Sequence, residues 1–191
     1  MKKLIFACLF GIISAAQAAA PTVTLSITPL SGRRSVTPTI TWSSSGAVSC
    51  SASSPDSLWN GAVALSGTKK LSTISTTKNT KTVTYNLTCV SGSDLTATLN
   101  WNAPIQNTDG STLTDLTSYK IYEVTTSPVL LNTVPSIVTS AYISGLSVGT
   151  HTYYVTAINS AGVESAPSNY GSKYTYGASS TTKSVTVTVT R

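Results

Sequence analysis

The sequence predicts an all-β protein built from two β-sandwich modules. Several stretches, such as 22–27 and 184–189, alternate polar and apolar residues with the period of two that is typical of half-buried strands. Serine and threonine are abundant, charged residues make up only 9% of the chain, and no stretch shows the period of an amphipathic helix. The 191 residues are enough for one or two domains, which most often hold roughly 100–150 residues each.

The N-terminal residues 1–18 are predicted to be a cleaved signal peptide. Lys2 and Lys3 form a basic start, and residues 4–15 form an apolar run that is too short to span a bilayer comfortably. Residues 16–18 place alanines at the two positions that a signal peptidase reads. We therefore expect a secreted, periplasmic or cell-surface protein with no stable membrane insertion after cleavage.

The charges of the mature chain indicate solubility rather than a charged ligand. Ten basic residues remain against six acidic ones, a net charge of about +4, and they are scattered apart from Arg33-Arg34 and Lys69-Lys70. A nucleic-acid-binding protein would show a concentrated basic stripe or basic residues interleaved with aromatic ones. We expect no nucleic-acid partner.

Cys50 and Cys89 are predicted to form a disulfide, since they are the two cysteines of the exported chain. Two cysteines and one histidine cannot complete the usual four-ligand zinc site, and a redox pair would normally have C-x-x-C spacing. We expect no metal and no cofactor. Closing a loop of about 40 residues stabilises a fold by roughly 4 kcal/mol on chain-entropy grounds.

In the predicted strands near these cysteines, apolar residues occupy every second position and therefore share one face. In the strand before Cys50, these residues are Ile40 and Trp42. Residues 21–93 resemble an immunoglobulin-like module common in exported bacterial proteins, in the pattern Thr41-Trp42-Ser43, Ser49-Cys50-Ser51, Leu58-Trp59-Asn60 and Tyr85-Asn86-Leu87-Thr88-Cys89. Antibody-type domains place their core tryptophan after the first cysteine, whereas Trp42 precedes it. Trp59 is a candidate surface-binding aromatic residue, although folding back over the disulfide is the favoured interpretation.

Residues 95–176 resemble a fibronectin type III domain. The resemblance rests on the order and spacing of the segments Ala97–Pro104, Ser118–Tyr122, Ile143–Thr150 and Val155–Ser168. It implies a scaffold or a binder rather than a catalyst, although fold alone does not fix function. A tyrosine usually opens the strand that holds Val155, and His151 stands at that position here.

One segment has the form of a catalytic motif, Gly145-Leu146-Ser147-Val148-Gly149, which matches G-x-S-x-G. A nucleophile elbow needs a strand, a sharp turn and a helix, and here the segment links two predicted strands. The six carboxylates of the mature chain form no close pair in the sequence that suggests acid-base catalysis. We expect a protein that is not an enzyme and has no catalytic residues.

The order of the two modules is open on the sequence alone. The first module needs a closing strand after Cys89, yet the strand from Leu95 belongs to the second module. Residues 184–190 form a strong strand beyond the end of the second module, behind a linker at 177–182 that is expected to be flexible. The favoured interpretation inserts the second module, 94–177, into the first, 19–93, which strand 184–190 completes. The alternative is a simple tandem order.

We therefore expect an exported binding or adhesion protein at a bacterial or phage surface, with a protein or glycan ligand. The alternatives are a carbohydrate-binding module and a structural spacer or decoration subunit. Carbohydrate binding requires an exposed aromatic platform. The candidate surface-binding aromatic residues are Trp59, Tyr122 and Tyr154, with Tyr170, Tyr174 and Tyr176 as further candidates for sugar contact.

Overall fold

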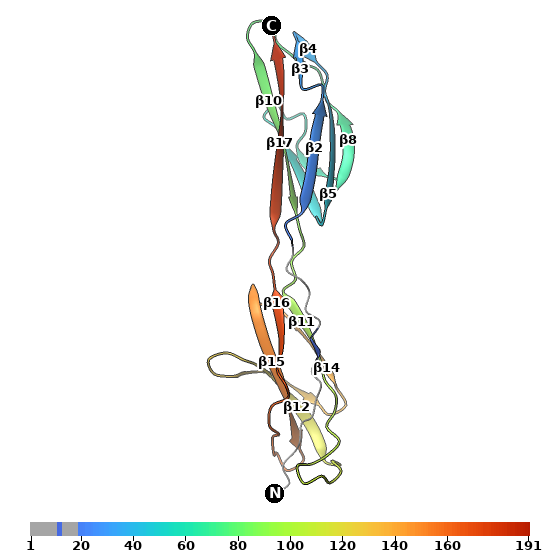
Figure 1. Ribbon diagram of the computed structural model, residues 1–191, viewed down its shortest axis with the longest axis vertical. Coiled ribbons are helices and arrows are strands. Elements are labelled where there is room, and N and C mark those ends of the chain that lie inside the picture. The colour runs from blue at the N-terminus through green and yellow to red at the C-terminus, as the bar shows by residue number, and fades with distance from the viewer. Residues whose placement is uncertain (1–10, 13–18) are drawn as a thin grey trace. The chain divides into compact units, whose positions relative to one another are not determined.

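The computed structural model describes residues 11–12 and 19–191, which form strands and loops without a helix (Figure 1). The chain divides into two compact units. Residues 94–176, with Gly11–Ile12, form the guest unit, and the described residues of 18–93 and 177–191 form the host unit. The expected all-β fold of β-sandwich modules is confirmed. Within the described residues no helix is long and apolar enough to span a membrane.

The host unit is a sandwich of two sheets. One sheet has the order β2-β5-β8, and the other has the order β3-β17-β10-β6-β7. A short ladder joins β4 to β9. The bounds are β2 (Thr22–Thr28), β3 (Ser31–Arg33), β4 (Ser35–Val36), β5 (Thr39–Ser45), β6 (Ser49–Ser53), β7 (Gly61–Val63), β8 (Ser66–Lys70), β9 (Ile74–Ser75), β10 (Lys81–Val90) and β17 (Ser180–Thr190).

The host core forms where the alternating apolar residues of the two sheets meet. Strand β5 contributes Ile40 and Trp42, as the alternation predicts, and β10 contributes four buried side chains in a row of alternate positions. Strand β17 adds Val187 and Val189, which have no solvent exposure. These valines show that the last strand contributes to the interior of the host unit.

Strand β17 begins earlier than the sequence suggests. The expectation of a flexible linker at 177–182 is wrong from Ser180 onward, because β17 pairs with β10 along its whole length, from Ser180 opposite Val90 to Val189 opposite Lys81. Threonine is a good strand residue, and the hydroxyl groups of Thr88 and Thr182 lie 2.8 Å apart across the pair. The polar composition that suggested a linker therefore forms the solvent-facing part of a ladder.

The predicted Cys50–Cys89 disulfide is confirmed. The two cysteines lie directly opposite each other on β6 and β10, with their Cα atoms 4.1 Å apart. Both strands belong to the same sheet. This bridge differs from the antibody-type disulfide, which joins the two sheets. The immunoglobulin-like resemblance of residues 21–93 stays a prediction.

The guest unit is a second sandwich of two sheets. One sheet has the order β1-β11-β14 and the other β13-β12-β15-β16. Its core contains the inward-facing residues predicted from alternation, including Trp101, Tyr119 and Val155. The bounds are β11 (Thr96–Asn100), β12 (Leu116–Glu123), β13 (Val129–Pro135), β14 (Ser140–Ser144), β15 (Gly149–Asn159) and β16 (Gly171–Thr175).

The predicted signal peptide, 1–18, lies outside the described residues except for β1 (Gly11–Ile12). Strand β1 pairs with Asn100 and Leu99 of β11 and forms the edge of its sheet. Cleavage after residue 18 would remove β1 and leave that edge of β11 without this partner.

Loss of the disulfide should weaken the host unit selectively. The double variant Cys50→Ala/Cys89→Ala is expected to lower the host free energy of unfolding by roughly 4 kcal/mol, because the unfolded chain loses a closed loop of about 40 residues. Urea unfolding followed by hydrogen exchange of host and guest peptides measures the two units separately. Equal destabilisation of both units, or no change in the host, would contradict this assignment.

Candidate functional site

The outer face of the guest sheet β13-β12-β15-β16 carries a continuous row of large side chains. Tyr122 lies opposite Leu130 on one neighbouring strand and opposite Tyr154 on the other. Residues that pair directly across strands share a face of the sheet. The rings of Tyr122 and Tyr154 stack at 4.9 Å, and Tyr170 contacts Tyr154 edge-on at 5.6 Å. We call these four residues the outer-face row.

The two ends of the outer-face row are exposed, whereas its centre is packed. Leu130 is 47% exposed and Tyr170 is 59% exposed, but Tyr154 is only 9% exposed. Val129 and Leu131 beside Leu130 are also exposed, which places three consecutive apolar residues on an edge strand. Such a concentration of exposed apolar residues is typical of an interaction surface.

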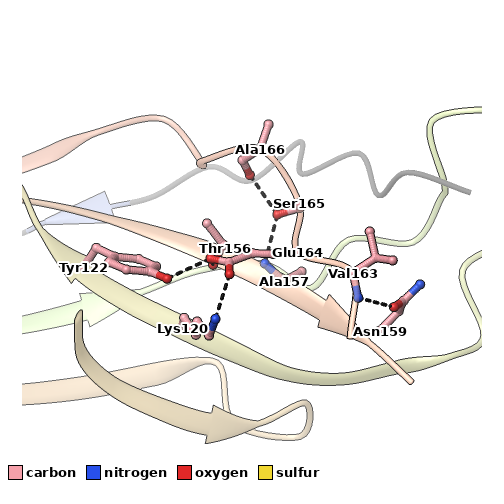
Figure 2. Close-up of polar contacts among 9 residues, drawn as sticks. All are labelled: Lys120, Tyr122, Thr156, Ala157, Asn159, Val163, Glu164, Ser165 and Ala166. Carbon is pink, nitrogen blue, oxygen red and sulfur yellow. Dashed lines mark hydrogen bonds and ion pairs between the residues drawn. The ribbon is translucent and has the colours of Figure 1, made fainter. Parts of the chain in front are cut away.

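Glu164 anchors this face through three polar contacts (Figure 2). Its carboxylate accepts hydrogen bonds from Lys120 Nζ at 2.7 Å, Tyr122 Oη at 2.9 Å and Thr156 Oγ1 at 2.7 Å. Burial raises the pKa of Glu164, but these three donors outweigh it and hold the pKa below its usual value. The tyrosine ring and the lysine are thereby held at fixed positions on the surface.

The segment that carries Glu164 is positioned by hydroxyl and amide side chains that bond to backbone. Gly162 supplies a left-handed turn at φ 74°, and Asn159 Oδ1 accepts a bond from the Val163 amide at 2.9 Å. Ser165 Oγ accepts from the Ala157 amide at 2.9 Å and donates to the Ala166 carbonyl at 2.7 Å, as Figure 2 shows. Ser165 thus satisfies the Ala157 amide of β15 and holds the neighbouring Glu164 above the sheet.

Of the two interpretations of Trp59, the structure agrees with the inward-folded one and contradicts the surface-binding one. Trp59 is 1% exposed and belongs to the host core, so it is not a surface-binding residue. Its ring packs against Trp42 at a centroid distance of 5.2 Å. Asp56 and Ser54 shape the loop that turns it inward, through bonds to the amides of Leu58 and Trp59. The loop around Trp59 is polar in sequence, but the tryptophan side chain itself packs in the host core.

Tyr122 and Tyr154 do lie on the surface face of the guest unit, but they differ from a sugar-binding platform. The two rings stack on each other with an interplanar angle of 16°, so each covers one face of the other. Tyr170 was among the further aromatic candidates from the sequence, but nothing in the sequence indicated that Leu130 and Glu164 would join this group. These three residues lie on three other segments, and only the register of the sheet brings them together.

The G-x-S-x-G segment does not form a nucleophile elbow. It joins β14 to β15, so a strand follows it instead of a helix. His151 contacts the backbone oxygen of Ser147 through Nε2 at 2.9 Å and contacts Glu123 through Nδ1 at 2.6 Å. Because both ring nitrogens are engaged, neither one faces the Ser147 hydroxyl as a base. His151 instead ties its strand to the backbone of the preceding loop.

Among residues 11–12 and 19–191 there is no group of three or more histidine, cysteine or carboxylate side chains that could hold a metal ion. The loop residue Asn107 is buried, and its amide nitrogen donates to Ser111 and Thr112.

The comparisons with known proteins return fibronectin-type structures of low similarity. No family model and no curated protein sequence matches the chain. The fibronectin(III)-like modules of Clostridium thermocellum CbhA align over 80% of this chain and 93% of theirs, with 10% identity and a TM-score of 0.32. The chicken CNTN1 FN1-FN3 domains align over 86% of this chain and 69% of theirs, with 12% identity and a TM-score of 0.35. At these TM-scores the likeness carries no argument about this chain.

The stability of the guest unit should depend on the ionisation of His151. Burial lowers the pKa of His151, but the hydrogen bonds to Glu123 and to the Ser147 carbonyl outweigh it, so the pKa is raised in the folded state. The charged form then contributes stability that is fully present below the unfolded-state pKa of about 6.5 and is lost as pH rises through the folded pKa.

Thermal unfolding of the guest unit between pH 5.5 and 8.5 measures this dependence. The melting temperature is expected to fall with rising pH in the wild type, and the slope should flatten in His151→Gln. A steeper slope in the variant than in the wild type would show that another group controls the transition.

Proposed function

We propose that this chain is an exported, non-enzymatic binding protein that acts in adhesion at a bacterial or phage surface. The observation that carries the proposal is the outer-face row of the guest unit, with Leu130 and Tyr170 exposed at its two ends. Tyrosine is enriched at protein interfaces because its ring supplies a large contact area with few rotatable bonds. A protein partner fits this combination of tyrosine and aliphatic residues.

The fixed geometry of the surface favours binding. Stacking holds Tyr122 and Tyr154, and the Glu164 carboxylate holds Tyr122 and Lys120. Side chains that are already ordered lose less conformational entropy when a partner docks. These contacts within the free protein therefore favour binding, because less conformational entropy is lost when a partner docks.

The partner is expected to dock on the face rather than to add a strand at the edge. The register of β13 against β12 shifts between Ile121 and Tyr122, which leaves Leu131 without a paired residue. Such a bulge and Pro135, which lacks an N–H, interrupt the regular row of backbone groups that strand addition needs. The side chains of the row then supply the contact.

Export is supported by the Cys50–Cys89 disulfide, since such bonds persist in oxidising compartments. Together with the predicted signal peptide, the disulfide supports a location outside the cytoplasm. Export combined with an apolar face supports a role at a surface.

Carbohydrate binding is the second candidate function, and Tyr170 is the residue that favours it. At 59% exposure, its ring is the one member of the row's three tyrosines with a large free surface. Sugar binding of useful affinity generally needs a broad aromatic platform, and the stacked pair does not offer one. A structural spacer is the third candidate and requires no ligand at all.

A random-peptide phage library panned on the immobilised full chain tests the binding proposal. We expect enriched apolar peptides whose affinity falls at least tenfold in Leu130→Asp and Tyr170→Ala. The matched control is Ile137→Asp, since Ile137 is 89% exposed but lies outside the row, and binding should be unchanged there. Enriched peptides that bind all three variants equally would contradict the assignment of the surface.

A glycan array run beside the panning separates the candidates. Glycan binding that Tyr170→Ala abolishes, without peptide enrichment, would replace the proposal with carbohydrate recognition. A chain that binds neither peptides nor glycans would leave the spacer function as the better account.

A further inference from the structure

The fold separates charge between the two units. The host unit holds eight basic side chains and a single carboxylate, Asp56, for a net charge of about +7, whereas the guest segment 94–176 holds two lysines and five carboxylates. Along the sequence these charges look scattered, which is why they suggested solubility alone. The host unit is therefore strongly attractive to anions.

All three arginines of the chain line one open cleft in the host unit. The cleft has a volume of about 760 Å³, and its lining consists of Arg33, Arg34, Arg191, Ser75, Thr76 and Thr77. The parallel pairing of β3 with β17 places Arg33 beside Thr190 and so brings Arg191, more than 150 positions away, to the same end of the sheet. Arg33 Nε donates to the Arg191 backbone oxygen at 3.3 Å.

Backbone hydrogen bonds hold the parts of the cleft together. The Arg34 amide donates to the Thr190 carbonyl at 2.7 Å, and the Arg34 carbonyl accepts from the Thr76 amide at 2.8 Å. Arg34 also adopts a left-handed backbone with φ 67°, which a residue with a side chain rarely does without support. These bonds fix the arginine pair against both the hydroxyl segment and the end of β17.

No carboxylate neutralises these arginines among the described residues. The ion pairs found there involve Lys120, His151 and Lys173, all in the guest unit. Three guanidinium groups around one cleft repel each other, so an anion that enters it relieves the repulsion. None of the side chains that line the cleft is acidic, so no lining side chain opposes such an anion.

We propose that this cleft binds a phosphate group. Guanidinium groups match tetrahedral oxyanions through paired N–H donors, and the hydroxyl groups of Ser75 and Thr77 add further donors. The Thr76 hydroxyl donates to the Asn79 carbonyl instead. A phosphate offers three or more oxygens to this donor set, whereas a carboxylate offers two. A nucleic-acid strand would also need aromatic rings for its bases, and the lining has none. The source is either a free phosphate compound or the headgroup of an anionic lipid.

NMR titration of the full chain with inorganic phosphate, against sodium chloride at matched ionic strength, tests the site. We expect saturable shifts of the Arg33, Arg34 and Arg191 side-chain resonances and of the Thr76 and Thr77 amides. The variant Arg33→Gln/Arg34→Gln/Arg191→Gln should weaken binding at least tenfold. The absence of saturable shifts in the wild type would overturn the proposal.

A matched control separates the cleft from the general charge of the host unit. The variant Lys69→Gln/Lys70→Gln/Lys183→Gln removes the same charge from outside the cleft and should change affinity less than twofold. Equal losses in the two variants would overturn the proposal in favour of diffuse attraction. Arg33→Lys/Arg34→Lys/Arg191→Lys keeps the charge without the paired donors and covers the case in which the glutamine variant fails to fold. Affinity equal to wild type in this lysine variant would also contradict recognition by paired donors.

Vesicles of phosphatidylglycerol, compared with phosphatidylcholine, identify the source of the phosphate. Co-sedimentation with phosphatidylglycerol that inorganic phosphate displaces would identify a lipid headgroup. Binding of inorganic phosphate without co-sedimentation would identify a free phosphate compound. Vesicle binding that survives in the arginine variants would count against the cleft.

Discussion

The antiparallel ladder between β10 and β17 is the interaction on which the rest of the structure depends. The ladder pairs ten residues of each strand, and β17 contributes Val187 and Val189 to the host core. On its other side β10 lies next to β6, the strand to which the disulfide joins it. The guest unit forms the connection between β10 and β17. Asp94 and Tyr176, where the guest begins and ends, pair with each other, so a folded guest closes the connection at a short effective length. An unfolded connection of roughly 90 residues would cost about 2 kcal/mol more to close than one of about eight.

The sequence predicted several of the strands, because burial on one face imposes an apolar residue at every second position. The inward positions of β10, β11 and β15 followed from alternation alone. The disulfide followed from the cysteine count and the predicted export. The strand at Ser180–Thr182 was missed because threonine and serine serve equally well in linkers and on the exposed side of a ladder.

The two proposed binding surfaces were less accessible to sequence reasoning, because both depend on contacts between distant segments. Tyr122 and Tyr154 were identified as aromatic residues on strands, but Leu130 joins them only through a register that a bulge alters. Trp59 shows the reverse case, in which a residue from a polar loop packs inside the core. Arg191 lies near Arg33 because β17 pairs in parallel with β3, although the two residues are more than 150 positions apart. No local sequence pattern encodes that proximity.

Hydrogen exchange of a chain truncated after Gly177, compared with the full chain, tests the dependence on β17 most directly. We predict that peptides from β5, β6 and β10 lose protection in the truncated chain, since β10 loses its partner and the core loses two buried valines. Peptides from β12 and β15 should keep their protection, because the guest unit is intact. Host peptides that exchange as slowly in the truncated chain as in the full one would contradict the account.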